Sequence, residues 1–189
     1  MRVVGGRLRS RPIAGPKEEG KSSEGLRPTA DRLREALFNI LMHAYGDPVT
    51  GARVLDLFAG TGALGIEAIS RGASFVQFVD DGLEARALLR QNTEALGLGG
   101  TTRIFRRDAT KLGPAHPMEP FSLVFLDPPY RKGLAELALT SAREGGWFKP
   151  EALVIVEEAV DAKFTAPQGF EELERRNYDD TELMFLRNA

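Results

Sequence analysis

Residues 54–65 of the chain read Val-Leu-Asp-Leu-Phe-Ala-Gly-Thr-Gly-Ala-Leu-Gly. The apolar run over residues 53–58 predicts a buried strand, and residues 63–71 predict a helix. Between them, Gly60 and Gly62 permit positive φ angles and let a ligand approach the backbone closely. A strand joined to a helix through such a turn is typical of an α/β fold with a parallel sheet.

An acidic residue indicates which ligand this glycine turn would hold. The turn satisfies the G-x-G-x-x-G pattern of dinucleotide-binding proteins, but Asp56 lies inside the strand that precedes it. A carboxylate there would repel a pyrophosphate at the helix N-terminus and would suit an ammonium group. S-adenosyl-L-methionine (SAM) carries an amino acid and no phosphate, so we expect this cofactor. Its expected contacts in the turn are Asp56, Phe58, Gly60 and Gly62. A tight turn that binds no ligand is the alternative.

Acidic residues also follow the next two expected strands. The second strand ends in Asp80-Asp81, where a carboxylate could accept hydrogen bonds from both ribose hydroxyls of a nucleoside cofactor. We prefer Asp80 for this role and keep Asp81 as the alternative. The third strand leads to Asp108-Ala109, where Asp108 could accept the amino group of adenine. The other interpretation is that these are solvated acidic residues in loops.

The apolar run over residues 121–126 is followed by Asp127-Pro128-Pro129-Tyr130. The two prolines end the strand, because each removes an amide donor and fixes its own backbone angle. The resulting stiff turn presents a carboxylate, free carbonyls and an aromatic ring. These groups suit a flat base that bears an amino group. We therefore take Asp127, Pro128 and Tyr130 as candidate catalytic residues, with a purely structural loop as the alternative.

Composition limits the possible classes of protein. A chain of 189 residues is expected to form one domain, and without cysteine it has no disulfide or thiolate metal site. The absence of a thiol also excludes methylation of a pyrimidine C5. Neither His43 nor His116 is expected to be catalytic or a ligand, so no metal is expected. The sequence shows neither a membrane-length apolar run nor a signal-peptide core, which favours a cytoplasmic location and no membrane partner.

Charge is unevenly distributed along the chain. Residues 1–34 carry nine Arg and Lys against four Asp and Glu, although the whole chain has a net charge of −2. A basic arm on an acidic body suggests a polyanionic partner. Arg7, Arg9 and Arg11 alternate with other residues, so an extended chain would point all three to one side. A charged edge strand that resists aggregation is the alternative. Residues 15–25 are polar and predict a mobile loop.

A helix is expected after residues 27–29, capped by Thr29 or Asp31. Its apolar positions share one face: Leu33, Leu37, Ile40 and Leu41. Arg32 and Arg34 are expected elsewhere on the helix, available to substrate or solvent. An ordinary surface helix would show the same pattern.

From residue 51 onward, strands and helices are expected to alternate, which predicts a parallel sheet with helices on both faces. Residues 170–176 and 182–187 depart from this pattern and predict an antiparallel hairpin at the sheet edge. Ligands of such sheets bind beyond the carboxyl ends of the strands. The four carboxylates expected at that edge are Asp56, Asp80, Asp108 and Asp127.

Together these motifs resemble the RsmD family of bacterial SAM-dependent methyltransferases. The matching stretches cover nearly the whole chain: Val-Val-Gly-Gly-Arg at 3–7 with Arg9 and Arg11, residues 26–39, residues 56–65, residues 127–130 and Gly146-Trp147. The glycine turn and Asp-Pro-Pro-Tyr are shared by many amino-methyltransferases, and the N-terminal motifs narrow the match. The family's second strand usually ends Glu-x-Asp, whereas this chain has Asp80-Asp81-Gly82, which weakens the assignment of the ribose to Asp80.

The resemblance implies a class I SAM-dependent methyltransferase (Rossmann-like) fold. Its seven-stranded, mostly parallel sheet would occupy residues 31–189, and residues 1–30 would form a basic substrate-binding extension. It implies methyl transfer to the exocyclic N2 of a guanine in small-subunit (16S) ribosomal RNA. It also implies that this RNA is part of a ribosomal particle when it is methylated. A monomer is the default expectation. The expected RNA contacts are Arg7, Arg9, Arg11, Arg27, Arg32 and Arg34.

The expected mechanism is direct in-line transfer without a metal. Asp127 and the Pro128 carbonyl would hold the amino group, and Tyr130 would stack on the base. Three alternatives remain: an adenine-N6 methyltransferase acting on RNA or DNA, a non-enzymatic nucleic-acid binder with the same fold, and a nucleotide-binding dehydrogenase. The last of these would leave Asp-Pro-Pro-Tyr unexplained.

Overall fold

The computed structural model describes residues 1–17 and 27–189, and the backbone alone for residues 27–29. In this part of the chain one seven-stranded sheet has the order β3-β2-β1-β4-β5-β7-β6. The strands are β1 (Arg53–Leu57), β2 (Phe75–Val79), β3 (Thr102–Phe105), β4 (Phe121–Leu126), β5 (Phe148–Ala159), β6 (Phe170–Tyr178) and β7 (Thr181–Asn188). The helices are α1 (Arg27–Ala44), α2 (Ala63–Ser70), α3 (Leu83–Ala95) and α4 (Leu134–Glu144), with a short 3₁₀ turn η1 (Val160–Ala162). Over the described ranges, no helix is both long and apolar enough to cross a lipid bilayer.

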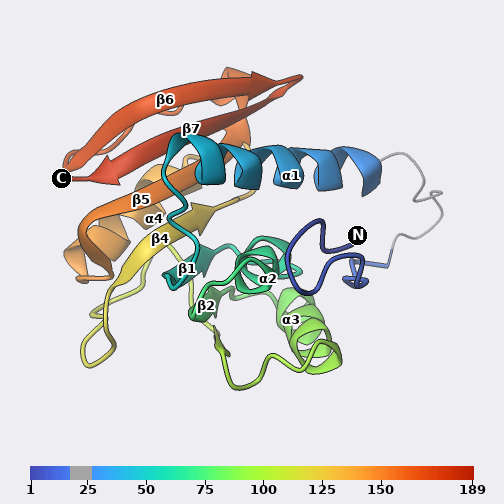
Figure 1. The fold of residues 1–189 in the computed structure, drawn as a ribbon. Helices are drawn as coiled ribbons and strands as arrows, with labels where there is room; N and C mark the ends of the chain where they lie inside the picture. The colour runs from blue at the N-terminus through green and yellow to red at the C-terminus, as the bar shows by residue number, and fades with distance from the viewer. Residues whose placement is uncertain (18–26) are drawn as a thin grey trace.

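The pairing of the strands confirms the predicted sheet. β1 pairs in parallel with β2 on one side and with β4 on the other, and β4 pairs in parallel with β5. β7 is antiparallel to both β5 and β6, so the C-terminal hairpin closes one edge of the sheet (Figure 1). The hairpin strands are longer than predicted because the chain reverses through Asp179 and Asp180 alone, with Asp179 at φ 56°.

Two hydrophobic cores lie on the two faces of the sheet. Helices α1, α2 and α3 cover one face and α4 covers the other (Figure 1). Side chains of a strand alternate between the faces, so Leu123 and Phe125 of β4 pack in the first core while Val124 and Leu126 pack in the second. The sheet is therefore buried on both sides, as its apolar parallel strands predict.

The N-terminal arm, residues 1–14, does not form the extended strand that the alternation of Arg7, Arg9 and Arg11 suggested. It folds back on itself through a turn at residues 7–10, and an antiparallel bridge joins Arg2 to Pro12. The reason is hydrophobic: three apolar side chains of the arm are buried in the core beneath α1 and α2. They are Val3, Leu8 and Ile13. The expectation that the three arginines form one extended row was wrong.

Helix α2 holds the arm through Glu67, whose carboxylate is fully buried. It accepts the amide protons of Val4 at 2.9 Å and Gly5 at 3.0 Å, and it pairs with Arg34 and Arg71. The next residue, Gly6, lies at φ 74°, where an added Cβ would come within 2.0 Å of the Ser70 carbonyl oxygen. Val-Val-Gly-Gly-Arg is therefore a docking segment for α2, and its second glycine is required by this close approach.

Helix α1 begins at Arg27, earlier than expected, so neither Thr29 nor Asp31 is its cap. Pro28 is compatible with this start, because a first-turn residue needs no amide donor. Asp31 instead accepts a hydrogen bond from Arg34, whose side chain also reaches the Arg2 carbonyl. The expectation that Arg34 is available to solvent was wrong, since it is only 5% exposed. The mobile loop expected at residues 15–25 lies mostly outside the described residues.

Candidate active site

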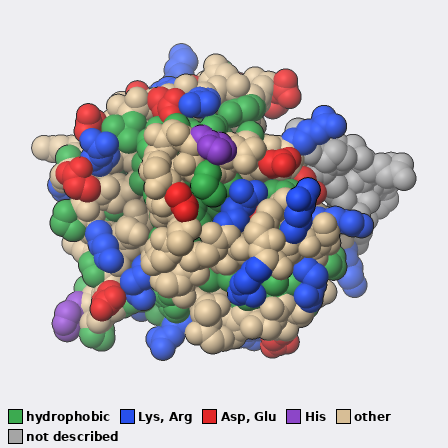
Figure 2. Space-filling view, in the orientation of Figure 1, with side chains coloured by type: hydrophobic (Ala, Val, Ile, Leu, Met, Phe, Trp, Pro, Cys, Tyr) green, Lys and Arg blue, Asp and Glu red, His purple; other side chains and the backbone are tan. Residues whose placement is uncertain are grey.

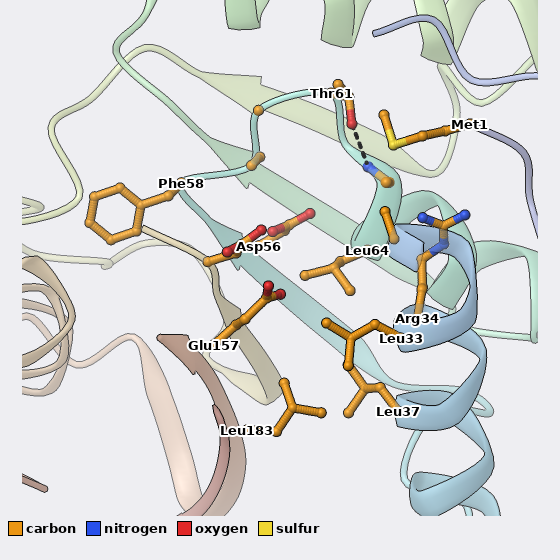
Figure 3. A pocket seen from close by; sticks show the side chains of 15 residues that line it. Met1, Leu33, Arg34, Leu37, Asp56, Phe58, Thr61, Leu64, Glu157 and Leu183 are labelled. Atoms are coloured by element: carbon orange, nitrogen blue, oxygen red, sulfur yellow. Dashed lines mark hydrogen bonds between the residues drawn. The ribbon is translucent and has the colours of Figure 1, made fainter. Parts of the chain in front are cut away.

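The carboxyl ends of β1, β4 and β5 meet at one edge of the sheet, where the strand order reverses between β1 and β4. Open parallel sheets bind ligands at such reversals. A cavity of about 330 Å³ lies there, lined by Asp56, Asp127 and Glu157, with α1 forming another wall (Figure 3). A second cavity of about 240 Å³ lies beyond β2 and β3. Phe58 lines both cavities, so they adjoin at the glycine turn.

Two carboxylates accept hydrogen bonds from backbone amides in and next to the glycine turn between β1 and α2. β1 ends one residue earlier than predicted, because Phe58 already has a positive φ of 57°. Asp56 accepts the amide of Gly65 at 3.0 Å, and Asp80 accepts the amide of Gly60 at 3.0 Å. The turn is therefore fixed in shape before any ligand enters, as binding of a cofactor to its backbone would require.

The second cavity brings together the predicted ribose and adenine contacts: Asp80, Asp81, Asp108 and Ala109. Asp80 uses one carboxylate oxygen for Gly60 and the other for the amide of Gly82 at 2.8 Å. Asp108 accepts the amide and hydroxyl of Thr110 on a single oxygen, which lowers its pKa and leaves the other oxygen available. Both Asp80 and Asp81 line the cavity, so the choice between them stays a prediction.

Hydrogen bonds join the Asp-Pro-Pro-Tyr turn to the neighbouring strand β5. The Tyr130 hydroxyl donates to Glu157 Oε1 at 2.6 Å and lies 3.3 Å from Thr181 Oγ1. The amide of Arg131 donates to Glu158 at 3.0 Å. The turn that carries Asp127 is therefore rigid relative to the sheet.

Glu157 is the functional candidate that the sequence reasoning missed. The signal was available: Asp56, Asp127 and Glu157 each stand two residues after a strand residue of the first core, namely Val54, Phe125 and Ile155. Strand alternation therefore puts all three carboxylates on the same face of the sheet. In Figure 3 Glu157 and Asp56 point toward one another across the cavity.

Burial changes the proton affinity of these three carboxylates, and neighbouring carboxylates add to the effect at Asp127. Burial raises the pKa of Asp56 to about 8, against a favourable hydrogen bond from Gly65. The pKa of Asp127 is raised by desolvation and then by the negative charge of Glu157, although its side chain still meets solvent in the cavity. Burial also raises the pKa of Glu157. A cationic ligand would stabilise the charged forms of these carboxylates, so the cavity suits a ligand with an ammonium and a sulfonium group.

The side chain of Asn92, on α3, joins the glycine turn to the arm. Its amide nitrogen donates to the Thr61 carbonyl at 2.9 Å and to the Ala14 carbonyl at 3.0 Å, and its oxygen accepts the Ala14 amide at 2.8 Å. Asn92 is 2% exposed and was not singled out from the sequence. A lone polar residue within a helical pattern gives no sign of such long-range partners.

The expected RNA-binding arginines separate into two groups. Arg7, Arg9, Arg11 and Arg32 are exposed, and Figure 2 shows basic side chains gathered over the part of the molecule where the arm lies. Arg34 lines the main cavity but is enclosed by its ion pairs with Asp31 and Glu67. The side chain of Arg27 lies outside the described residues. Phosphate contacts are therefore physically available to the first group.

Comparisons with known proteins identify the family of this chain. Residues 1–187 match the family described as Conserved hypothetical protein 95. The chain is 38% identical over 161 residues to ribosomal RNA small subunit methyltransferase D of Escherichia coli (strain K12), covering 85% of this chain and 76% of that protein. It is 34% identical over 172 residues to the Haemophilus influenzae protein of the same name, covering 90% and 84%. The solved structure of methyltransferase yhhF from Escherichia coli has a TM-score of 0.81 at 29% identity, covering 100% and 97%.

Proposed function

Because the chain belongs to the Conserved hypothetical protein 95 (RsmD) family, we propose that it methylates the exocyclic N2 of a guanine in small-subunit ribosomal RNA, with SAM as the methyl donor. One observation supports this most strongly. The acidic cavity at Asp127 adjoins the cavity of Asp80 and Asp108 at Phe58. A nucleoside cofactor and a flat acceptor base therefore have neighbouring places.

The residues present fit SAM. Asp108 and Ala109 would hold the adenine, and Asp80 or Asp81 would accept the ribose hydroxyls. Asp56 would attract the ammonium group of the amino-acid part, directly or through water, while the glycine turn leaves room along the backbone. The cofactor supplies an electrophilic methyl group on a sulfonium, and the positive charge is lost as that methyl leaves.

The acceptor amino group would be held by the Asp-Pro-Pro-Tyr turn. The Asp127 carboxylate and the Pro128 carbonyl would accept its two hydrogens and direct the nitrogen lone pair toward the methyl group. After transfer the nitrogen must lose one proton. The Asp127 carboxylate, which would already hold one of the amino hydrogens, is the group placed to accept that proton, and burial raises its pKa and so its basicity. The Tyr130 ring, fixed through Glu157, would limit the plane of the base.

The substrate we propose is the RNA within a ribosomal particle, bound by a monomer in the cytoplasm. The exposed arginines of the arm and Arg32 of α1 would contact phosphates of the RNA. The acidic remainder of the chain would keep nonspecific RNA binding weak.

The test uses methyl-labelled SAM and small ribosomal subunits from a strain that lacks this gene, followed by digestion to nucleosides. Label in N2-methylguanosine is expected. Label in N6-methyladenosine would preserve the mechanism but overturn the base assignment. In the same assay Asp127→Ala should abolish transfer while calorimetry still detects SAM binding. Glu144→Ala, an exposed change at the end of α4, is the matched control and should leave both unchanged. Normal turnover by Asp127→Ala would contradict the mechanism.

A further inference from the structure

The carboxylate of Glu157 has a placement that holding Tyr130 does not explain. Its Oε1 accepts the Tyr130 hydroxyl at 2.6 Å, and within the described residues Oε2 takes part in no protein hydrogen bond. The residue lines the main cavity together with Asp127. One oxygen is thus fixed by the protein while the other remains available to a ligand.

The register of the sheet puts this oxygen beside the expected amino-group site. Leu126 of β4 is paired with Val156 of β5, so the next residues along the two parallel strands are Asp127 and Glu157. Among neighbouring charges, that of Glu157 raises the pKa of Asp127 the most. A base whose amino group is held at Asp127 would have its adjoining ring edge near Glu157.

The bases differ at the ring atom next to the amino group. Guanine presents N1–H beside its N2 amino group, which makes two neighbouring donors. Adenine and 2-aminopurine present an unprotonated N1 beside their amino groups, which is an acceptor. A pair of neighbouring acceptors in the protein therefore complements guanine and opposes the other two.

We propose that Glu157 is a specificity-determining residue, whose free carboxylate oxygen accepts the N1–H of guanine while Asp127 and Pro128 hold the N2 amino group. This rests on the proposed function. The rival explanation gives Glu157 only a structural role, in which it holds the Tyr130 ring in place. The two explanations differ in the expected effect of replacing Glu157. If its role is structural, methylation of every base slows equally; if it reads the base, the ratio of the methylation rates between bases changes.

The experiment compares guanine with 2-aminopurine at the nucleotide that the labelling assay identifies. Both have the amino group to be methylated, and small subunits are reconstituted from splint-ligated RNA that carries one or the other. The wild-type protein should prefer guanine by about 100-fold or more in kcat/KM, because unpaired polar groups in a closed site are strongly rejected. Glu157→Gln should reduce that ratio at least about tenfold, since its amide can donate to the N1 of 2-aminopurine while its oxygen still accepts from Tyr130.

Three variants separate the explanations. Glu158→Gln removes a neighbouring carboxylate that does not line the cavity, and it should leave the ratio unchanged. Tyr130→Phe removes the hydroxyl and should slow both substrates without changing the ratio. Glu157→Asp keeps the acceptor chemistry and should retain the preference for guanine at a lower rate. SAM binding by calorimetry verifies that each variant is folded.

The outcomes distinguish a failure of the reading role of Glu157 from a failure of the proposed function. If the wild-type protein methylates guanine and the ratio is the same in Glu157→Gln, the reading role is overturned and the proposed function stands. If the wild-type protein accepts both bases equally, the reading role is also overturned. If it methylates neither purine in any substrate although SAM binds, the proposed function itself fails.

Discussion

Replacement of Glu67 by alanine should detach the N-terminal arm and destabilise the whole fold. The carboxylate is fully buried and accepts four hydrogen bonds: from the amides of Val4 and Gly5, and from the Nε atoms of Arg34 and Arg71 at 3.2 and 3.0 Å. Arg34 is itself nearly inaccessible, so loss of Glu67 leaves a buried guanidinium with Asp31 as its remaining acidic partner.

The size of the effect follows from these contacts. Removal of one partner from a buried ion pair costs about 3–5 kcal/mol. The two lost backbone hydrogen bonds, at about 1 kcal/mol each, are of the same order and form part of that cost. For a domain of this length each kcal/mol lowers the melting temperature by about 2–4 °C, so Tm should fall by about 6–20 °C.

Urea denaturation measures the loss, and hydrogen exchange locates it. The amides of Val4, Gly5 and Leu8 should exchange much faster in Glu67→Ala, because their acceptors lie on or beside the altered residue. Glu35→Ala, on the exposed side of α1, is the matched control and should change stability by less than about 0.5 kcal/mol. A loss below about 1 kcal/mol in Glu67→Ala, with slow exchange retained in the arm, would refute the docking role.

Three further perturbations test separate features. Burial raises the pKa of Asp56 to about 8 in the folded protein, so the folded state keeps a proton that the unfolded state loses near pH 4. The contribution of this group to stability therefore falls as pH rises from 4 toward 8. Asp56→Asn should flatten the decline of the urea midpoint between pH 5 and 8, and an unchanged decline would count against the raised pKa. Gly6→Ala should cost at least about 2 kcal/mol in urea denaturation, because the residue combines a positive φ with a carbonyl contact that leaves no room for Cβ; a stability equal to that of the wild-type protein would disprove this. Replacing Arg9 and Arg11 together by alanine should lower subunit affinity and reduce the slope of log K against log salt by roughly 1.5, with SAM affinity intact; filter binding with an unchanged slope would show that these side chains do not contact phosphate.

The sequence predicted the fold and the gathering of four acidic residues at one edge of the sheet for a simple reason. A parallel sheet puts all its carboxyl ends on one edge, so acids that follow strands must gather there. Asp56, Asp80, Asp108 and Asp127 follow this rule and line the two cavities. None of these positions depends on a contact between distant parts of the chain.

The features that were not predicted all depend on such distant contacts. Arg34 is spaced three residues before Leu37 and so belongs to the buried stripe of α1, but its burial requires Glu67, which lies on another helix. The turn of the arm likewise requires the Ser70 carbonyl, which accepts the Arg7 amide at 2.9 Å. Alternation of charged and apolar residues is also typical of an extended strand. The local pattern alone therefore favoured an extended arm, whereas the arm folds back through a turn.

The amide group of Asn92 links two binding events by thermodynamics. It holds the Thr61 carbonyl in the glycine turn and both polar backbone groups of Ala14 in the arm. If SAM steadies the turn, part of that free energy reaches the arm through this one side chain. Reciprocity then requires RNA seated on the arm to strengthen SAM affinity by the same factor. The enzyme would bind its two substrates synergistically, and neither would need to move the sheet.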